Sequence, residues 1–373
     1  MSAHITRRSF IRATGTAGLG LAALSRSVMG EVADTVSAAG KNIRNYKPSM
    51  KYRQMGSTGI YVSAFSIGTT RGELEPVNAG IERGVNFIHT LQHYMGGKGI
   101  ELVAQAIKGR ADKVHLGLKD NFDSLENALK TLGVNSVDFI FFARHNPDDL
   151  KKELPELKKR FMEWRDKGMV RFAGLTSHKH MDVMIDIAIE AGFFSVVMPA
   201  YGPAQVKEFG RQREALRKKG MSIVAMKAKG EVSDADFPTQ ITTALGDDAV
   251  TTVCKGVKTM EELATWTAAA NSAKTGWLRF DDGSRHAYAG CAMCGACEGA
   301  CPNGVAAADI VRCVRYYQGS EHDPRLAAEQ FSGMHLAHSL ASCTSCGACE
   351  QVCPQRMQVR QEIATARRLW AAA

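Results

Sequence analysis

The C-terminal part of the chain contains two copies of one cysteine pattern, and this duplication constrains the structure more than any other feature. The first run, C-A-M-C-G-A-C-E-G-A-C-P, spans residues 291–302, and the second, C-T-S-C-G-A-C-E-Q-V-C-P, spans residues 343–354. Both read C-x2-C-x2-C-x3-C-P. The runs hold eight of the ten cysteines, and the first 253 residues contain none. A disulfide framework would instead spread its cysteines along a short chain.

This spacing is typical of [4Fe–4S] clusters. Three cysteines at three-residue spacing let one tight loop reach three iron corners of a cubane. Gly295 and Gly347 allow the backbone to curl close to the sulfides, and the proline after the last cysteine turns the chain away. Structural zinc is the alternative, but zinc sites use two separated cysteine pairs around one tetrahedral ion. The pattern therefore predicts two [4Fe–4S] clusters.

The two runs resemble the motif of bacterial two-cluster ferredoxins, in which the fourth cysteine of each run ligates the other cluster. The resemblance implies one set of ligands made of Cys291, Cys294, Cys297 and Cys353, and a second made of Cys343, Cys346, Cys349 and Cys301. Apolar spacing at residues 306–317 and 326–340 predicts helices between the runs. We therefore expect a small helical ferredoxin-like domain over residues 285–373. Cys313 lies in the first of these helices and is predicted to be a core residue rather than a ligand.

The N-terminus reads as a targeting segment. Residues 6–12 are T-R-R-S-F-I-R, and a mildly apolar, glycine-rich run follows from residue 13 to residue 24. The arginine pair with Phe10 and Ile11 resembles a bacterial Tat export signal. An apolar run of about 12 residues is shorter than the roughly 20 that span a bilayer, so no stable membrane span is expected. An ordinary basic helix is the alternative. Small residues stand before Glu31 and before Gly40, and the sequence does not choose between these two cleavage sites.

We accordingly expect residues 1–39 to be a Tat signal peptide and linker. The partner during export is then the Tat translocase, and the mature protein is periplasmic. The Tat route carries folded proteins, which suits a chain whose clusters are assembled before export.

The middle of the chain alternates short apolar runs with longer amphipathic segments. Eight runs are predicted as buried strands: 62–67, 87–89, 114–118, 139–142, 171–175, 196–198, 223–225 and 251–253. Helical stretches such as 101–108, 125–132, 157–167 and 182–191 fall between them. Eight β/α repeats predict an α/β fold, a (β/α)8 TIM barrel over residues 50–275, followed by the ferredoxin-like domain.

Several segments of this region are similar to aldo/keto reductases. They are Y-R-Q-M-G-S-T-G-I-Y-V-S-A-F-S-I-G-T from residue 52, G-V-N-F-I-H-T from 84, V-R-F-A-G-L-T-S-H from 170, M-S-I-V-A-M-K from 221 and V-T-T-V-C-K-G-V-K-T-M-E-E-L from 250. Their order, together with the tail, resembles the iron–sulfur branch of that family.

The resemblance implies a site at the barrel mouth. The family reduces carbonyls with NADPH through an Asp, Tyr, Lys and His tetrad, in which the tyrosine is the acid. Tyr94 matches the tyrosine and Lys119 the lysine. The aspartate position is occupied by His89. The histidine position falls at Ala143, with His145 two residues beyond.

The same resemblance implies contacts to a nicotinamide cofactor. Tyr201 would stack on the nicotinamide ring and Thr176 would lie near its carboxamide. Lys227, Gly256 and Thr259 lie in the segments that bind the rest of the cofactor. The chain departs from the family pattern at Gly202 and Lys255. NADP is therefore a doubtful third cofactor beside the clusters.

Two other interpretations were weighed. Five histidines near predicted strand ends, at positions 89, 93, 145, 178 and 180, invite a metal site, although histidines there are more often simply hydrogen-bonded. The net charge of +9 raises the question of nucleic acid. The basic residues follow helix faces without interleaved aromatics, so no nucleic-acid partner is expected.

Two functions follow. One is an exported oxidoreductase that acts on a small carbonyl or unsaturated substrate, with electrons relayed by the clusters. The alternative is a non-catalytic electron-transfer module whose barrel docks a redox partner protein. A hydride carries two electrons and each cluster exchanges one, and the chain shows no flavin motif to connect them.

Overall fold

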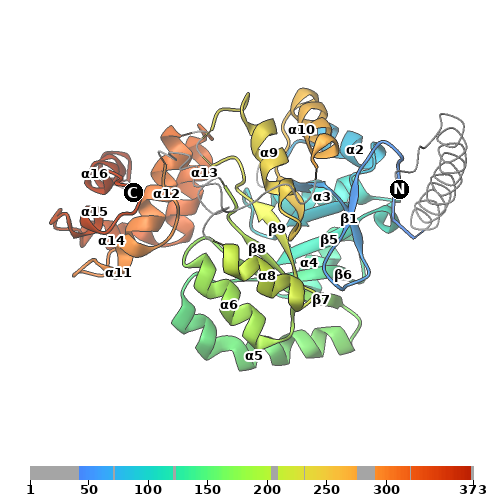
Figure 1. Cartoon of the computed structure of the whole chain (residues 1–373), viewed down its shortest axis with the longest axis horizontal. Coiled ribbons are helices and arrows are strands. Elements are labelled where there is room, and N and C mark those ends of the chain that lie inside the picture. The colour runs from blue at the N-terminus through green and yellow to red at the C-terminus, as the bar shows by residue number, and fades with distance from the viewer. Residues whose placement is uncertain are drawn as a thin grey trace, which may run out of the picture.

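The structure, a computed structural model, describes residues 42–69, 72–120, 123–202, 209–230, 232–274, 290–319 and 321–370. The predicted export signal lies outside these ranges. Figure 1 shows two bodies, a barrel surrounded by helices and a smaller all-helical domain at the C-terminal end of the chain. In the part of the chain that is described, no helix is long and apolar enough to cross a membrane.

The barrel is closed by eight parallel strands, as the sequence predicts. They are β3 (Phe65–Gly68), β4 (Phe87–Thr90), β5 (His115–Lys119), β6 (Val137–Ala143), β7 (Val170–Ser177), β8 (Phe194–Pro199), β9 (Ser222–Met226) and β10 (Val250–Lys255), and β10 pairs with β3 to complete the ring. The surrounding helices are α2 (Leu74–Glu82), α3 (Lys98–Ile107), α4 (Leu125–Leu132), α5 (Pro147–Asp166), α6 (Met181–Ala191), α8 (Gly210–Lys218), α9 (Phe237–Gly246) and α10 (Met260–Ser272), with a 3-10 turn at Ala111–Lys113.

The first predicted strand, residues 62–67, is wrong as a single element. Its first half belongs to β2 (Tyr61–Ser63), which pairs antiparallel with β1 (Tyr52–Gln54), and its second half belongs to β3. The hairpin closes the amino-terminal end of the barrel, because its turn residue Ser57 donates a backbone hydrogen bond to Gly220 just before β9 (2.7 Å). The sequence did not reveal the break at residue 64, because apolar residues stand on both sides of it.

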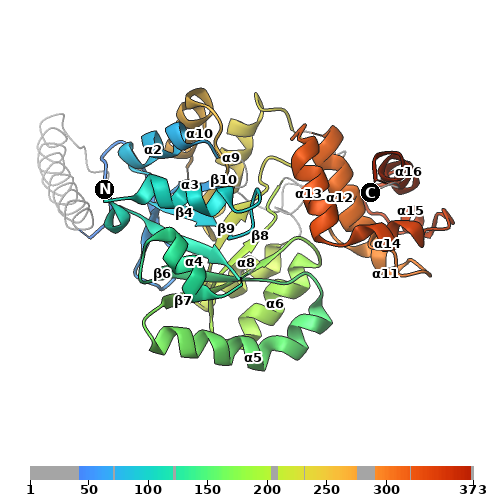
Figure 2. The same cartoon turned by 180° about the vertical axis from the view of Figure 1, so that it is seen from behind.

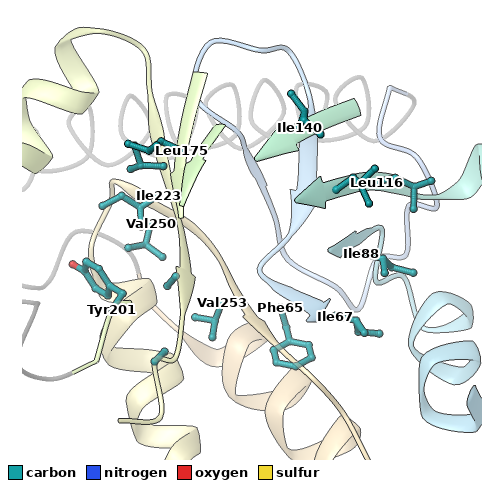
Figure 3. Packing of buried hydrophobic residues seen from close by; sticks show 14 of the residues in the cluster. Phe65, Ile67, Ile88, Leu116, Ile140, Leu175, Tyr201, Ile223, Val250 and Val253 are labelled. Atoms are coloured by element: carbon teal, nitrogen blue, oxygen red, sulfur yellow. The ribbon is translucent and has the colours of Figure 1, made fainter. Parts of the chain in front are cut away.

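Successive side chains along each strand point alternately into the barrel and toward the surrounding helices, and this produces two apolar layers. One fills the barrel interior and includes Phe87, Phe139 and Phe141. The other packs between strands and helices, and Figure 3 shows it from close by. Gly117 and Gly174 leave room for the Phe141 ring, since a Cβ at either position would lie within 3.0 Å of it. The packed interior therefore fixes the positions of the side chains at the carboxyl ends of the strands, which form the mouth of the barrel.

The described residues of the C-terminal domain form six helices around one core. They are α11 (Ala296–Gly299), α12 (Ala307–Gln318), α13 (Pro324–Gly333), α14 (Leu336–Ala341), α15 (Ala348–Gln351) and α16 (Val359–Trp370). Cys313 is fully buried in this core, as predicted. The helix predicted over residues 326–340 is two helices, because His335 adopts a left-handed conformation (φ 53°) between them. In both views, α12 and α13 lie next to the barrel, and α15 and α16 lie farther from it (Figure 2).

Candidate functional site: the cysteine loops and the barrel mouth

The eight cysteines of the two runs surround two cavities. One is lined by Cys291, Cys294, Cys297 and Cys353, and the other by Cys301, Cys343, Cys346 and Cys349. Each cavity thus takes three cysteines from one run and the last cysteine from the other. These are the two sets of four that the ferredoxin resemblance implies.

The backbone repeats itself around the two cavities at an interval of 52 residues. Gly295 and Gly347 share left-handed φ values of 81° and 84°. The sulfur of Cys291 accepts a hydrogen bond from the Met293 amide (3.4 Å), and that of Cys343 accepts one from the Ser345 amide (3.4 Å). The last cysteines also accept amide hydrogen bonds, from Val305 to Cys301 and from Met357 to Cys353. Amide donors of this kind stabilise negative charge on sulfur. They therefore suit cysteines that bind iron as thiolates.

The two loops differ in their surroundings. Met293 in the first loop packs against the hydrophobic core of the barrel, whereas its counterpart Ser345 is exposed. A Cβ on Gly295 would lie 2.5 Å from the His180 ring, so that barrel histidine touches the first loop. Among the eight cysteines, all of which are described, Cys346 alone is exposed. The first cavity therefore faces the barrel and the second faces outward.

Ion pairs join the barrel to the C-terminal domain beside the first loop. Lys179, directly after β7, bonds Glu298 (2.9 Å) and Asp309 (2.6 Å). Asp309 in turn bonds Arg312 (2.8 Å). The carboxylates hold the pKa of Lys179 above its usual value, although burial lowers it. These residues fix α12 over the carboxyl ends of the strands.

Tyr94 and Lys119 lie together at the barrel mouth. The Lys119 ammonium, at the end of β5, donates to the Tyr94 hydroxyl oxygen (3.3 Å). His89 on β4 is buried near Lys119, and its ring stands edge-on to Phe141, with centroids 5.3 Å apart. Burial, assisted by the Lys119 charge, lowers the pKa of His89 to about 3. His89 is therefore neutral at pH 7 and cannot replace an aspartate as counter-ion for Lys119.

His145 also lies at the mouth, beside His178. The His178 amide donates to Nδ1 of His145 (3.2 Å), and the two ring centroids are 4.9 Å apart. Burial and the charge of Arg312 lower the pKa of His145 to about 3. Arg312 reaches into the mouth from α12 and contacts Nδ1 of His178 (2.5 Å).

Lys227, at the end of β9, contacts the Tyr316 hydroxyl of α12. Burial, together with the nearby charges of Arg312 and Lys119, holds the pKa of Lys227 well below its usual value. The predicted stacking residue Tyr201 lies elsewhere. Its side chain is buried in the layer between strands and helices (Figure 3), and its hydroxyl bonds Asp247.

The remaining predicted cofactor residues have structural contacts. Thr176 donates to the Met198 carbonyl (2.8 Å) inside the barrel. Thr259 caps α10 by accepting from the Glu262 amide (3.1 Å). Gly256 lines a cavity of about 230 Å³, which also contains Lys255 and Lys258.

A larger cavity, of about 640 Å³, opens at the carboxyl ends of β5 and β6. His145, Asp120, Arg144 and Trp164 are among the residues that line it. Asp120 is held by Arg144 (3.0 Å) and by the Ala143 amide (2.8 Å). His145 thus connects this cavity to the residues at the centre of the mouth.

The five mouth histidines do not form one cluster. His93 is exposed and lies 3.5 Å from Asp123, whereas His180 packs on Gly295. In the described part of the chain, no three His, Cys, Asp or Glu side chains are arranged around a single metal ion.

Sequence reasoning missed Arg312 and Tyr316, which α12 contributes to the mouth. A signal was available, because Asp309, Arg312 and Tyr316 occur at helical spacing within an apolar stretch. Charged residues on the buried face of a helix usually have a specific partner.

Comparisons with known proteins agree with both domains. A model of the 4Fe-4S dicluster domain family matches residues 290–358. The chain is 28% identical over 174 residues to aldo-keto reductase YhdN of Bacillus subtilis (strain 168), covering 37% of this chain and about half (51%) of that relative's length. Aldo-keto reductase AKR11C1 of Bacillus halodurans superposes with a TM-score of 0.52 in its holo form and 0.50 in its apo form. In both cases the identity is 18%, over 61% of this chain and 92% of that one. The protein therefore joins a barrel with the aldo/keto reductase fold to a C-terminal 4Fe-4S dicluster domain.

Proposed function

We propose that this protein is an exported iron–sulfur oxidoreductase that acts on a small carbonyl or unsaturated substrate at the barrel mouth, with electrons relayed by two [4Fe–4S] clusters. The observation that carries the proposal is the contact between the barrel and the first cysteine loop. Three consecutive residues after β7 touch the C-terminal domain: His178 at Arg312, Lys179 at Glu298 and Asp309, and His180 at Gly295.

The cysteine cavities fit the two clusters. Each has four cysteines, and amide N–H groups point at two of the sulfurs in each loop region. Clusters of this type, when bound, exchange electrons one at a time. The first set of cysteines lies against the barrel and the second set lies nearer to solvent. An external redox partner would therefore meet the second loop first.

The barrel mouth offers proton donors for reduction of a substrate. Tyr94 can give its phenolic proton to an oxygen or carbon that gains electron density, while Lys119 donates to the phenolic oxygen left behind. His145 is a second donor, because it lies next to the large cavity through which a substrate would enter. Its low pKa means that it is a neutral imidazole, so it can donate a hydrogen bond to the substrate, while Tyr94 is the residue that gives the proton.

NADP fits these residues poorly at its nicotinamide end. Tyr201 has its ring in the apolar core rather than at the mouth, and Lys227 is engaged by Tyr316. The cavity at Lys255 and Lys258 would accept only the far end of such a cofactor. We therefore propose that the reductant is a one-electron carrier and that NADPH supports little or no turnover.

One observation favours the alternative, a non-catalytic electron-transfer module. Arg312 and Tyr316 of α12 cover the carboxyl ends of β7 and β9, where a substrate would be expected in a barrel enzyme. Under this alternative the clusters are reduced but the barrel converts no substrate.

A comparison of electron donors tests the proposal. Aldehydes and quinones would be offered to the anaerobically purified protein with NADPH, and then with a reduced viologen. We expect turnover with the viologen only, and Tyr94→Phe should lower it roughly 100-fold or more because the proton donor is lost. The matched control is Tyr46→Phe, an exposed tyrosine whose ring lies beside that of Tyr52 in β1. Ordinary NADPH-dependent turnover would overturn the proposed reductant, and cluster reduction without turnover would favour the alternative.

A further inference from the structure

Two lysines at the barrel mouth have no carboxylate partner. Lys119 is buried (7% exposed), and Lys227 is half-buried, with its ammonium over the Tyr316 ring (4.7 Å to the centroid). Among the described residues neither ammonium forms an ion pair; each contacts only a tyrosine hydroxyl. Burying a cation without a counter-ion lowers the stability of the folded protein. Such a residue is therefore a candidate for a functional role.

Unpartnered polar atoms surround the same place. Within the described ranges, Nε2 of His89, Nε2 of His178 and Nε of Arg312 are buried and have no hydrogen-bond partner. His178 accepts from Arg312 at Nδ1, so its Nε2 carries the proton and is a donor. Such orphaned donors in a native structure need an explanation, and a bound acceptor is the simplest one.

The carboxylates near the mouth form ion pairs with other residues. Asp309 bonds Lys179 and Arg312, Asp120 bonds Arg144, and Glu321 bonds Lys255. None of these carboxylates pairs with Lys119 or Lys227. The centre of the mouth therefore keeps an excess of positive charge and of hydrogen-bond donors.

We infer that the barrel mouth binds an anionic group, and that the substrate carries a carboxylate or a similar oxyanion next to the carbon that is reduced. This inference rests on the proposed function and names its substrate class. The anion would accept hydrogen bonds from Lys119 and Lys227, with Nε2 of His178 as a further donor. Arg312 makes the C-terminal domain part of the same site.

The large cavity lies beside this site. His145 lines the cavity on one side and accepts the His178 amide on the other. An anion that enters between β5 and β6 would therefore meet His145 first. Arg144 and Arg160 line the cavity together with Asp120, Asp123 and Glu126, so its wall carries charges of both signs.

Binding to the cluster-containing protein tests the inference. Isothermal titration under anaerobic conditions would compare pyruvate and inorganic phosphate with pyruvamide, the neutral analogue of pyruvate. Pyruvate should bind roughly 10- to 100-fold more tightly than pyruvamide, because charge-assisted hydrogen bonds are lost with the charge. Equal affinities, or no binding of either anion, would overturn the inference.

Two variants and a control complete the test. Lys119→Met and Lys227→Met should each weaken pyruvate binding at least 10-fold, whereas Lys255→Met, whose ammonium is paired with Glu321, should not. Without pyruvate, Lys227→Met should melt at a higher temperature than the unaltered protein, because a half-buried cation without a counter-ion has been removed. A lower melting temperature together with unchanged binding would show that Lys227 has only a structural role, and would overturn the inference.

The outcome is separable from that of the proposed function. Anion binding without turnover of any carbonyl compound would leave the site standing while the enzyme proposal fails. Turnover of neutral aldehydes without anion binding would support the enzyme proposal and overturn the anion site.

Discussion

Arg312 of α12 contacts Nδ1 of His178 at the end of β7, across the boundary between the two domains (2.5 Å). Both side chains are buried, and Asp309 holds the guanidinium from the other side (2.8 Å). The histidine is therefore kept neutral with its Nδ1 as acceptor. The contact ties the position of one barrel strand to the orientation of one helix in the cysteine-rich domain.

Removing the charge of Asp309 should weaken this boundary. Asp309→Asn leaves Lys179 with one carboxylate and Arg312 with none, and we expect a loss of roughly 3–5 kcal/mol in the free energy of unfolding. Urea denaturation would measure it. The control is Asp186→Asn, which breaks a pair with exposed Arg211 and should cost much less, because solvent screens the pair. Equal losses would show that the boundary pairs contribute no more than a surface pair.

The shared cysteine cavities predict a specific pattern of iron content. The unaltered protein should contain about eight irons per chain, and Cys294→Ala about four. Adding Cys353→Ser to Cys294→Ala should change little, because both line the same cavity. Adding Cys301→Ser instead should reduce the remaining cluster as well. Iron analysis and EPR after dithionite would measure both pairs. The opposite pattern would mean that each run of four cysteines holds its own cluster.

Acid should destabilise the protein through His89. Its pKa is about 3 in the folded protein and about 6.5 when unfolded, so only the unfolded chain takes up a proton between these values. Stability is therefore complete above pH 6.5 and is lost as the pH falls toward 3. At pH 5 the loss from this residue is about 2 kcal/mol.

His89→Gln isolates that contribution. The difference in unfolding free energy between pH 7.5 and pH 5.0 should be smaller in this variant than in the unaltered protein. Exposed His338 supplies the control, since His338→Gln should keep the original difference. An unchanged difference in His89→Gln would mean that the buried imidazole is protonated in the folded state.

Export should depend on the arginine pair in the N-terminal segment. Replacing Arg7 and Arg8 by lysine should leave the protein in the cytoplasm, because a Tat receptor distinguishes guanidinium from ammonium groups. Cell fractionation followed by immunoblotting would measure it. The control replaces Arg12 by lysine and keeps the pair intact. Unchanged periplasmic levels in the double variant would contradict the Tat interpretation.

The sequence predicted the architecture well, because both domains carry strong local signals. Eight apolar runs with amphipathic segments between them specify the barrel, and the duplicated cysteine spacing specifies the C-terminal domain. The first strand was misplaced because a buried hairpin and a buried strand are both simply apolar. The break before α14 was missed because His335 adopts a left-handed conformation that residue type alone does not indicate.

The site was harder to predict, since it depends on contacts between distant segments. Tyr94 and Lys119 lie together as the resemblance implies. The resemblance also implied that Tyr201 stacks on a cofactor ring, whereas in the fold its hydroxyl bonds Asp247. Arg312 and Tyr316 lie about 40 residues beyond the last barrel helix, α10, in the chain. Only the docking of α12 brings them to the mouth.

The exchange of last cysteines between the two cavities has a consequence for biogenesis. Neither cysteine run can supply four ligands by itself, so neither half of the domain can mature alone. A chain that is cut or misfolded in one half loses a ligand from the other half too. Both cysteine runs must therefore be folded before either cavity has its four cysteines.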